Sequence, residues 1–278
     1  MCTNPIFLSE PYYNRKNFDD KFFHRLKLGH SFAKDFIPLP CGKCPECLKA
    51  RSDEWTMRLK LELMEHEESC FITLTYSDTD GELCKRDYQL FLKRLRKFIY
   101  PRKIRYFLCG EYGSKKKRPH FHCLIFGYIF DDLRFFYEKK GIKYYLSETL
   151  SKLWNNGYVL VQRIDDNCLK YVTKYMQKLV SYDDKTVKPF VAMSNRPGIA
   201  YNYVEKLKKD RSDNIFLNGR RYRYPRYFLK KLVDLGYHDT VEYIKDMRIL
   251  RSYFRCKLDL LSSENKFYKS ITRLKIKM

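Results

Sequence analysis

The chain has 278 residues, and its 56 Lys and Arg against 33 Asp and Glu give a net charge of +23. This length allows one large domain or a domain with extensions, and the charge favours a polyanionic partner, with nucleic acid the first candidate. No apolar run is long enough to cross a membrane, and the opening residues "MCTNPIFLSEPYYNRKN" lack the pattern of a signal peptide, so we expect an intracellular protein.

The first 50 residues are irregular and end in a tight cysteine cluster, "PCGKCPEC". In an intracellular chain, the C-x₂-C-x₂-C spacing of Cys41, Cys44 and Cys47 indicates a metal site rather than disulfides. A structural Zn²⁺ takes four ligands, and we expect Cys2 to be the fourth, with another cysteine or a histidine as alternatives. An iron–sulfur cluster or three free thiols would also match this spacing.

Strand and helix patterns follow one another through the middle of the chain. The segment between Gly127 and Gly157 shows no clear pattern. The alternation predicts an α+β fold, with a central antiparallel sheet flanked by helices. The predicted elements are a helix from Leu48 to about Glu65, a strand at Cys70–Ser77, a helix with the apolar stripe Leu90, Phe91, Leu95 and Phe98, strands at Ile104–Glu111, His120–Gly127 and Gly157–Ile164, and a helix at Asn167–Val180.

The C-terminal part is basic and carries two local signals. Asn218-Gly219 in "IFLNGRRYRY" predicts a β-hairpin. The segment "PRYFLKKLVDLG" predicts a helix, because Pro225 lies near its start and Gly236 just past its end. The expected organisation is an N-terminal zinc-knuckle arm (1–50), a core (51–185) and a basic C-terminal extension (186–278).

Two histidines open the strand in "RPHFHCLIFG". If the strands that contain Glu111 and His120 pair as a hairpin, these two residues lie opposite each other, and His122 shares their face. One carboxylate and two imidazoles form a ligand set for a divalent metal, and oxygen ligation with open positions suits Mg²⁺ or Mn²⁺ acting on a phosphate. The alternative is that both histidines are ordinary polar residues at a strand end.

The helix "NCLKYVTKYMQKLV" has two stripes on its surface. The first is apolar and predicted to be buried; the second alternates tyrosine with lysine. A nearby ammonium stabilises a phenolate, so the second stripe is suited to attack a phosphodiester. The alternative is a basic face that contacts phosphates without chemistry. The stripes are Leu169, Val172, Met176 and Leu179, and Tyr171, Lys174, Tyr175 and Lys178.

Together these features resemble the HUH endonuclease superfamily, the single-strand nickases that start rolling-circle replication. The H-hydrophobic-H motif matches His120-Phe121-His122, and "FITLTYS" is similar to the family's first motif. Tyr171 and Tyr175 match its tyrosine motif, and "GEYG" lies where related initiators place a third metal ligand. The segments "PCGKCPECLKARSDEWTMRLKLE", "GEYG…RPHFH", "YVTKY" and "RPGIAYNY" look like replication initiators of Microviridae, especially gokushovirus-like phages.

This resemblance implies a mechanism and partners. A tyrosine attacks the origin phosphate of single-stranded DNA, leaving a 5′-phosphotyrosine and a 3′-OH for a host polymerase. Tyr171 would attack first, and Tyr175 would cleave the regenerated origin so that the circle is religated. Lys174 and Lys178 would stabilise the charge. No G-x-x-x-x-G-K-[ST] motif occurs, so a host helicase would unwind the duplex in the bacterial cytoplasm.

Two other functions match the same residues. The 24 Tyr and the basic charge would also suit a non-catalytic, zinc-stapled nucleic-acid-binding protein. A relaxase or transposase of the same superfamily would share the histidine and tyrosine motifs. The cysteine motif favours the phage initiator.

Overall fold

The computed structural model describes residues 6–8, 37–77, 81–113, 118–178, 187–207 and 212–248. The chain forms two compact units, which we call the sheet unit (Leu48–Lys206) and the terminal unit (Met1–Cys47 with Leu207–Met278). The three-part organisation drawn from the sequence stays a prediction. Residues 187–206, assigned there to the C-terminal extension, belong to the sheet unit.

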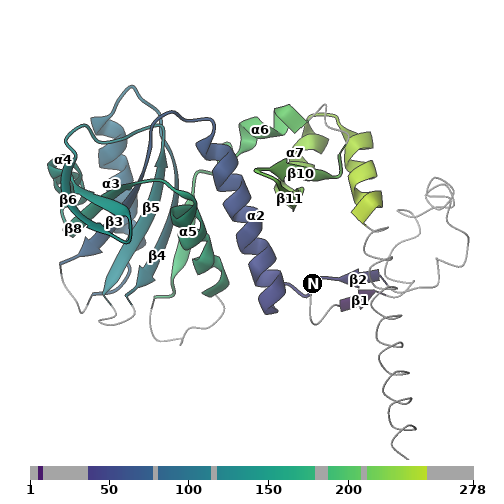
Figure 1. Ribbon diagram of the computed structural model, residues 1–278, viewed down its shortest axis with the longest axis horizontal. Helices are drawn as coiled ribbons and strands as arrows, with labels where there is room; N and C mark the ends of the chain where they lie inside the picture. The colour runs from purple at the N-terminus through teal and green to yellow at the C-terminus, as the bar shows by residue number, and fades with distance from the viewer. Residues whose placement is uncertain are drawn as a thin grey trace, which may run out of the picture. The chain divides into compact units, whose positions relative to one another are not determined.

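The sheet unit is built on seven strands (Figure 1). They are β3 (Ser69–Tyr76), β4 (Arg105–Tyr112), β5 (Pro119–Phe126), β6 (Arg134–Lys139), β7 (Ile142–Leu146), β8 (Gly157–Arg163) and β9 (Phe190–Met193). Their order across the sheet is β6-β7-β8-β3-β5-β4-β9, and every neighbouring pair is antiparallel. The predicted α+β fold with a central antiparallel sheet is confirmed.

Five helices accompany the sheet: α2 (Pro45–Leu63), α3 (Lys85–Phe98), α4 (Glu148–Trp154), α5 (Asp166–Lys178) and α6 (Tyr201–Lys206). Helix α2 begins before the predicted Leu48, so Cys47 lies in its first turn. The segment without a clear pattern contains β6, β7 and α4. No helix in the described part of the chain is both long and apolar enough to cross a membrane.

Helices α3 and α4 cover one face of the sheet and enclose the main apolar core (Figure 1). Strand alternation points Phe121, Cys123 and Ile125 of β5 into this core. The predicted stripe of α3 is partly wrong. Phe91 and Leu95 are buried, but Phe98 is 56% exposed, because the helix ends there. The inward positions of α3 are completed by Tyr88, Leu92 and, just past the helix end, Ile99.

The opposite face of the sheet, which we call the site face, carries His120 and His122 and is covered by α2 and α5 (Figure 1). The two helices are joined by buried hydroxyl groups. Oγ1 of Thr173 in α5 lies 3.2 Å from Oγ of Ser52 and 2.8 Å from Oγ1 of Thr56 in α2. These contacts fix the rotation of α5 and therefore decide which of its side chains turn toward the sheet.

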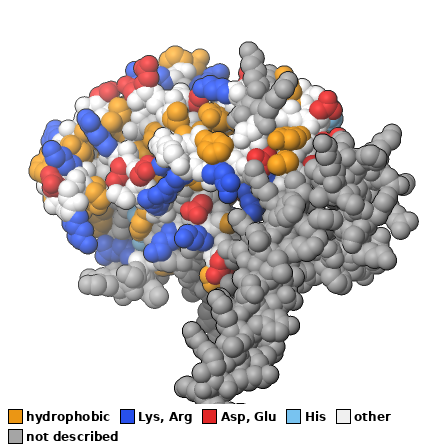
Figure 2. Space-filling view, turned by 45° about the vertical axis from the view of Figure 1, so that its right-hand side comes forward, with side chains coloured by type: hydrophobic (Ala, Val, Ile, Leu, Met, Phe, Trp, Pro, Cys, Tyr) orange, Lys and Arg blue, Asp and Glu red, His pale blue; other side chains and the backbone are white. Residues whose placement is uncertain are grey.

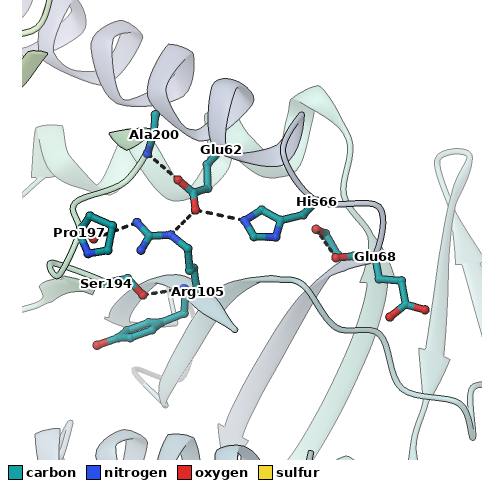
Figure 3. Close-up of polar contacts among 9 residues, drawn as sticks. Glu62, His66, Glu68, Arg105, Ser194, Pro197 and Ala200 are labelled. Carbon is teal, nitrogen blue, oxygen red and sulfur yellow. Dashed lines mark hydrogen bonds and ion pairs between the residues drawn. The ribbon is translucent and has the colours of Figure 1, made fainter. Parts of the chain in front are cut away.

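At one end of the site face, a buried carboxylate holds several segments together (Figure 3). Glu62 of α2 accepts hydrogen bonds from Nε of Arg105 and from the backbone N–H of Ala200, and Nε2 of His66 lies 3.2 Å from its Oε1. Arg105 also donates to the carbonyl oxygen of Pro197 at 3.0 Å. The Glu62 cluster, as we call these residues, thus ties the "RPGIAYNY" segment to β4 and α2.

The charge state of Glu62 follows from this cluster. Burial raises the pKa of its carboxyl group, but the hydrogen bonds from His66 and Ala200 and the charge of Arg105 lower it by more. The pKa is therefore below the ordinary value of 4.5, and the carboxylate stays ionised inside the protein.

The terminal unit contains two short antiparallel sheets. Strands β1 (Ile6–Leu8) and β2 (Ile37–Leu39) pair with each other, and β10 (Asn214–Leu217) pairs with β11 (Arg220–Arg223). The predicted hairpin turn is confirmed, because Asn218 and Gly219 both have positive φ, +49° and +70°.

The helix predicted after this hairpin is confirmed as α7 (Arg226–Asp234). Pro225 is its N-cap, and Gly236, with φ of +86°, follows its end. Residues 238–248 form a further helix. On the face in view, Figure 2 shows Lys and Arg side chains lying among hydrophobic ones, in keeping with the net charge of +23.

Candidate metal centre and tyrosine helix

Strands β4 and β5 bring a carboxylate and two imidazoles together on the site face. The register pairs Glu111 with His120, as predicted, and His122 lies two residues further along the same face. Oε1 of Glu111 is 3.0 Å from Nε2 of His120 and 2.9 Å from Nε2 of His122. One ligand atom from each residue lies within 4.8 Å of the others, so this triad could hold one metal ion.

The orientation of His120 favours a cation in the triad. Its Nδ1 lies 3.0 Å from the carbonyl oxygen of Arg118, which can only accept a hydrogen bond, so Nδ1 carries a proton. In the neutral ring, Nε2 then presents a lone pair to the Glu111 carboxylate at 3.0 Å. Two acceptors so close repel each other unless a cation or a proton lies between them, as in metal sites whose histidines are held by an outer hydrogen bond.

His122 is held from its other side by the neighbouring strand. Its Nδ1 lies 3.0 Å from Oγ1 of Thr73 in β3, and its ring stacks on Phe71 with centroids 5.6 Å apart. Burial lowers the pKa of His122 below its ordinary value, although Glu111 opposes this shift. The neutral imidazole, which is the form that binds metals, is therefore favoured.

Thr73 is a site residue that the sequence analysis missed. It lies in "FITLTYS", and alternation together with the β3–β5 register places it opposite His122 on the site face. The signal was therefore present in the sequence, but it becomes readable only when the partner strand and its register are known.

Helix α5 brings a tyrosine hydroxyl onto the triad. The hydroxyl of Tyr171 donates to Oε1 of Glu111 at 3.1 Å and lies 3.4 Å from Nε2 of His122. The Tyr171 ring meets the His122 ring edge-on, with centroids 4.9 Å apart, and the residue remains 41% exposed. A phenol in this position can reach both the triad and a strand of DNA in solvent.

The other predicted residues of this helix are placed in part. Lys174 lies one turn after Tyr171 and is exposed. Leu169 and Val172, from the predicted core stripe, are buried. The side chains of Tyr175, Met176 and Lys178 and the whole of Leu179 lie outside the described residues, so their placement stays a prediction.

The terminal unit contains the second possible metal site. The Sγ atoms of Cys41, Cys44 and Cys47 lie within 4.8 Å of one another. The N–H of Cys44 donates to Sγ of Cys41 at 3.4 Å, and Gly42, with φ of +75°, allows the tight turn between them. Three converging thiols suit a zinc-type ion. Cys2, the predicted fourth ligand, lies outside the described residues.

The scattered cysteines of the sheet unit behave as small core residues. Cys109 and Cys123 are buried, as predicted for their apolar strands, and burial raises the pKa of both thiols. Burial likewise raises the pKa of Cys70 to about 12. These thiols are therefore protonated and unsuited to metal binding or nucleophilic attack.

Comparison with known proteins places this geometry in a family. Residues 69–180, which contain both the triad and Tyr171, match the model of the replication-associated protein ORF2 family. The chain is 34% identical to replication-associated protein ORF4 of Chlamydia phage 1, over 79% of this chain and 61% of that protein. It is 28% identical to replication-associated protein ORF2 of Spiroplasma virus 4, over 76% of this chain and 72% of the relative.

A third relative is replication-associated protein VP4 of Bdellovibrio phage phiMH2K, 30% identical over 68% of this chain and 65% of that protein. The chain thus spans about three fifths of the length of the Chlamydia phage 1 relative. No solved structure matches the chain. By the family model and these three relatives, the chain belongs to the ORF2 family of replication-associated proteins of single-stranded DNA phages.

Proposed function

We propose that the chain is a metal-dependent, tyrosine-linked endonuclease that nicks and rejoins single-stranded origin DNA in rolling-circle replication. The observation that carries this proposal is the contact of the Tyr171 hydroxyl with Glu111 at 3.1 Å, on a carboxylate that also meets both histidines. A nucleophile beside a ligand set for a divalent ion is what transfer of a phosphodiester to a protein side chain requires.

In this reaction the phenolic oxygen of Tyr171 attacks the phosphorus of the scissile phosphodiester. The new bond is the tyrosine O–P bond, and the P–O3′ bond breaks. The phenol loses its proton and the leaving 3′ oxygen gains one, so a 5′-phosphotyrosine and a 3′-OH result. Glu111 holds the hydroxyl through the hydrogen bond at 3.1 Å, which orients it before attack. Mg²⁺ or Mn²⁺ held by the triad would polarise the phosphate.

The second tyrosine and the lysines complete the proposed cycle. Tyr175 attacks the regenerated origin, and the 3′-OH released first then displaces Tyr171, which closes the circle. Lys174 and Lys178 stabilise phenolate and phosphate charge. The 3′-OH is extended by a host polymerase, a host helicase opens the duplex, and the work takes place in the bacterial cytoplasm.

Covalent capture tests this proposal. A circular single-stranded phage DNA that carries the gene for this chain is incubated with the protein and Mn²⁺ or Mg²⁺. We expect linear DNA with the chain attached to its 5′ end through an SDS-resistant bond, mapped to Tyr171 by mass spectrometry. Both Tyr171→Phe and EDTA should abolish the first adduct, whereas Tyr175→Phe should retain it and block rejoining.

Two outcomes would contradict the proposal. An adduct of undiminished yield from the double variant Tyr171→Phe/Tyr175→Phe would show that another residue attacks. Salt-sensitive DNA binding by the wild-type protein without any adduct would instead favour a non-catalytic binding protein.

For the cysteine cluster we propose structural Zn²⁺, held by Cys41, Cys44 and Cys47 with Cys2 as the fourth ligand. Metal analysis of the purified protein should find one zinc per chain, and Cys44→Ser should lose it. A preparation that contains iron and shows visible absorption would point to an iron–sulfur cluster instead.

A further inference from the structure

The triad is one end of a row of side chains that crosses four strands. The registers pair Glu111 with His120, His120 with Thr75, and Thr75 with Tyr158. Residues paired directly across antiparallel strands point to the same face, so Tyr158 of β8 lies on the site face together with the triad. Strands are about 4.8 Å apart, which puts Tyr158 about 10 Å from His120 along the row.

Tyr158 is unusually exposed for this face of the sheet. Its exposed fraction is 64%, whereas Glu111 and His122 are buried and His120 and Thr75 are partly buried. The register of β7 with β8 pairs Tyr145 with Val161, so β7 ends beside Leu160 and does not extend to Tyr158. The aromatic ring therefore lies at an open corner of the sheet, next to the metal ligands.

The next row on the site face continues the same surface. Thr73 pairs with Leu160, Leu146 lies beside Leu160, and Leu146 pairs with Arg134 of β6. Leu160 is partly buried, Leu146 is 38% exposed and Arg134 is exposed. The surface next to the triad thus combines one aromatic ring, two aliphatic side chains and a guanidinium.

We propose that this surface is a stacking platform for single-stranded DNA, with Tyr158 as the residue that stacks on a base next to the scissile phosphate. The inference rests on the proposed function, because the strand must pass over the triad. A distance of about 10 Å corresponds to about three stacked nucleotide steps of 3.4 Å. A base two or three nucleotides from the cleaved bond therefore reaches the ring while its phosphates stay near the triad.

The chemistry of the surface favours a nucleic-acid strand as its occupant. A tyrosine ring offers a π-face to any base, and cations along the path attract the phosphates. Such cations are present on the site side, since Arg134 of β6 and Lys170 and Lys174 of α5 are exposed. Continuity with the triad supports the same occupant, because a phosphate held by metal ligands leaves flanking nucleotides that must lie on the adjoining sheet surface.

Stacking would also contribute to catalysis through position. A flexible strand bound only at its phosphate can rotate about the P–O bonds, so its reactive phosphate seldom lines up with the Tyr171 hydroxyl. Holding a neighbouring base fixes the direction of the strand and raises the fraction of productive complexes. Tyr158 is accordingly a positioning residue, and its removal should weaken binding as well as slow cleavage.

Matched variants test the proposal. Tyr158→Ala removes the ring, Tyr158→Phe and Tyr158→Trp keep one, and Phe135→Ala is the control. Phe135 is 61% exposed on β6, but its pairing with Tyr145 places it on the opposite face of the sheet. Each change is made in the Tyr171→Phe background, so that binding is measured without cleavage, by fluorescence anisotropy of an oligothymidine in the presence of Mg²⁺.

We expect Tyr158→Ala to weaken binding about tenfold, within the range for loss of one base–aromatic stack. Tyr158→Phe, Tyr158→Trp and Phe135→Ala should bind as the Tyr171→Phe parent does. With 2-aminopurine at successive positions along an oligonucleotide that contains the cleavage site, one position should be quenched by the parent protein and released by Tyr158→Ala.

The outcomes separate this inference from the proposed function. If the wild-type protein forms the covalent adduct but Tyr158→Ala binds as its parent does, the platform is wrong and the nuclease proposal stands. If no adduct forms but Tyr158→Ala still binds about tenfold more weakly, the platform stands without the nuclease. Equal weakening by Tyr158→Ala and Phe135→Ala would mean that the surface does not recognise the strand through this ring.

Discussion

Two buried carboxylates contact β4, one near each end of the strand, and their surroundings differ. Glu62 contacts Arg105 at the start of β4 and also accepts a hydrogen bond from the backbone of Ala200. Glu111, near the end of β4, contacts two imidazoles and a phenol hydroxyl. The six residues that separate Arg105 from Glu111 correspond to about 20 Å of strand.

The comparison shows how similar residues serve stability in one place and chemistry in another. A guanidinium is permanently charged, so the Glu62 cluster is neutralised by the fold itself. Imidazoles are neutral when they act as ligands, so the triad gains its positive charge from a proton or from a metal ion. We therefore expect changes at Glu62 to affect folding and changes at Glu111 to affect the reaction.

The largest expected effect is on catalysis at the triad. Glu111→Gln removes a ligand charge and should slow adduct formation on the order of 10³-fold, because a bound metal supplies several kcal/mol of transition-state stabilisation. The free energy of unfolding without metal should change by less than about 1 kcal/mol, since the amide is isosteric and no buried charge is left unpaired. Single-turnover cleavage and urea unfolding measure the two quantities. A large loss of stability with normal cleavage would reverse the comparison.

The second effect is on stability at the Glu62 cluster. Glu62→Gln leaves the Arg105 guanidinium without its buried partner and should lower the free energy of unfolding by about 3 kcal/mol. Cleavage per folded molecule should stay within about twofold, because the cluster is remote from the triad. The control is Glu68→Gln, whose partner Arg102 is 3.0 Å away in an exposed pair and whose loss should cost less than about 1 kcal/mol. Equal costs for the two variants would refute the proposed anchoring role.

The third effect separates orientation of a ligand from ligation itself. Thr73→Val removes the hydroxyl that lies 3.0 Å from Nδ1 of His122 and should weaken Mn²⁺ binding about 10- to 100-fold. Thr73→Ser keeps the hydroxyl and should restore most of the affinity, measured by isothermal titration. If valine and serine behave alike, the hydrogen bond does not orient His122.

The smallest effect is a dependence of stability on pH. The pKa of Glu62 is lower in the folded protein than its ordinary value of 4.5. Its contribution to stability is therefore complete above 4.5 and is lost as the pH falls through the folded pKa, because the unfolded chain takes up the proton first. Urea unfolding of wild-type protein and Glu62→Gln from about pH 7 to about pH 3 should give a difference that shrinks toward acid. A difference that is constant across this range would mean that the carboxylate does not titrate with folding.

Much of the local structure could be predicted from the sequence, and the errors are informative. The β4–β5 register was assumed from a short hairpin, and it is confirmed because Glu111 and His120 are close in sequence. Strands β6 and β7 were missed because both are largely exposed, so neither shows the apolar alternation that a buried face imposes. Phe98 was assigned to the core because helical periodicity alone does not show where α3 ends.

By itself, the sequence determined the charge, the antiparallel α+β class, the cysteine spacing and the histidine strand. Each of these depends on residues near one another in the chain, where hydrophobic periodicity and turn chemistry act. Only the tertiary structure brought Tyr171 to Glu111, because the packing of Thr173 against α2 fixes how α5 lies on the sheet. Only the strand order placed Tyr158 in the row of the triad, since pairing between distant strands is decided by the whole core rather than by any local pattern.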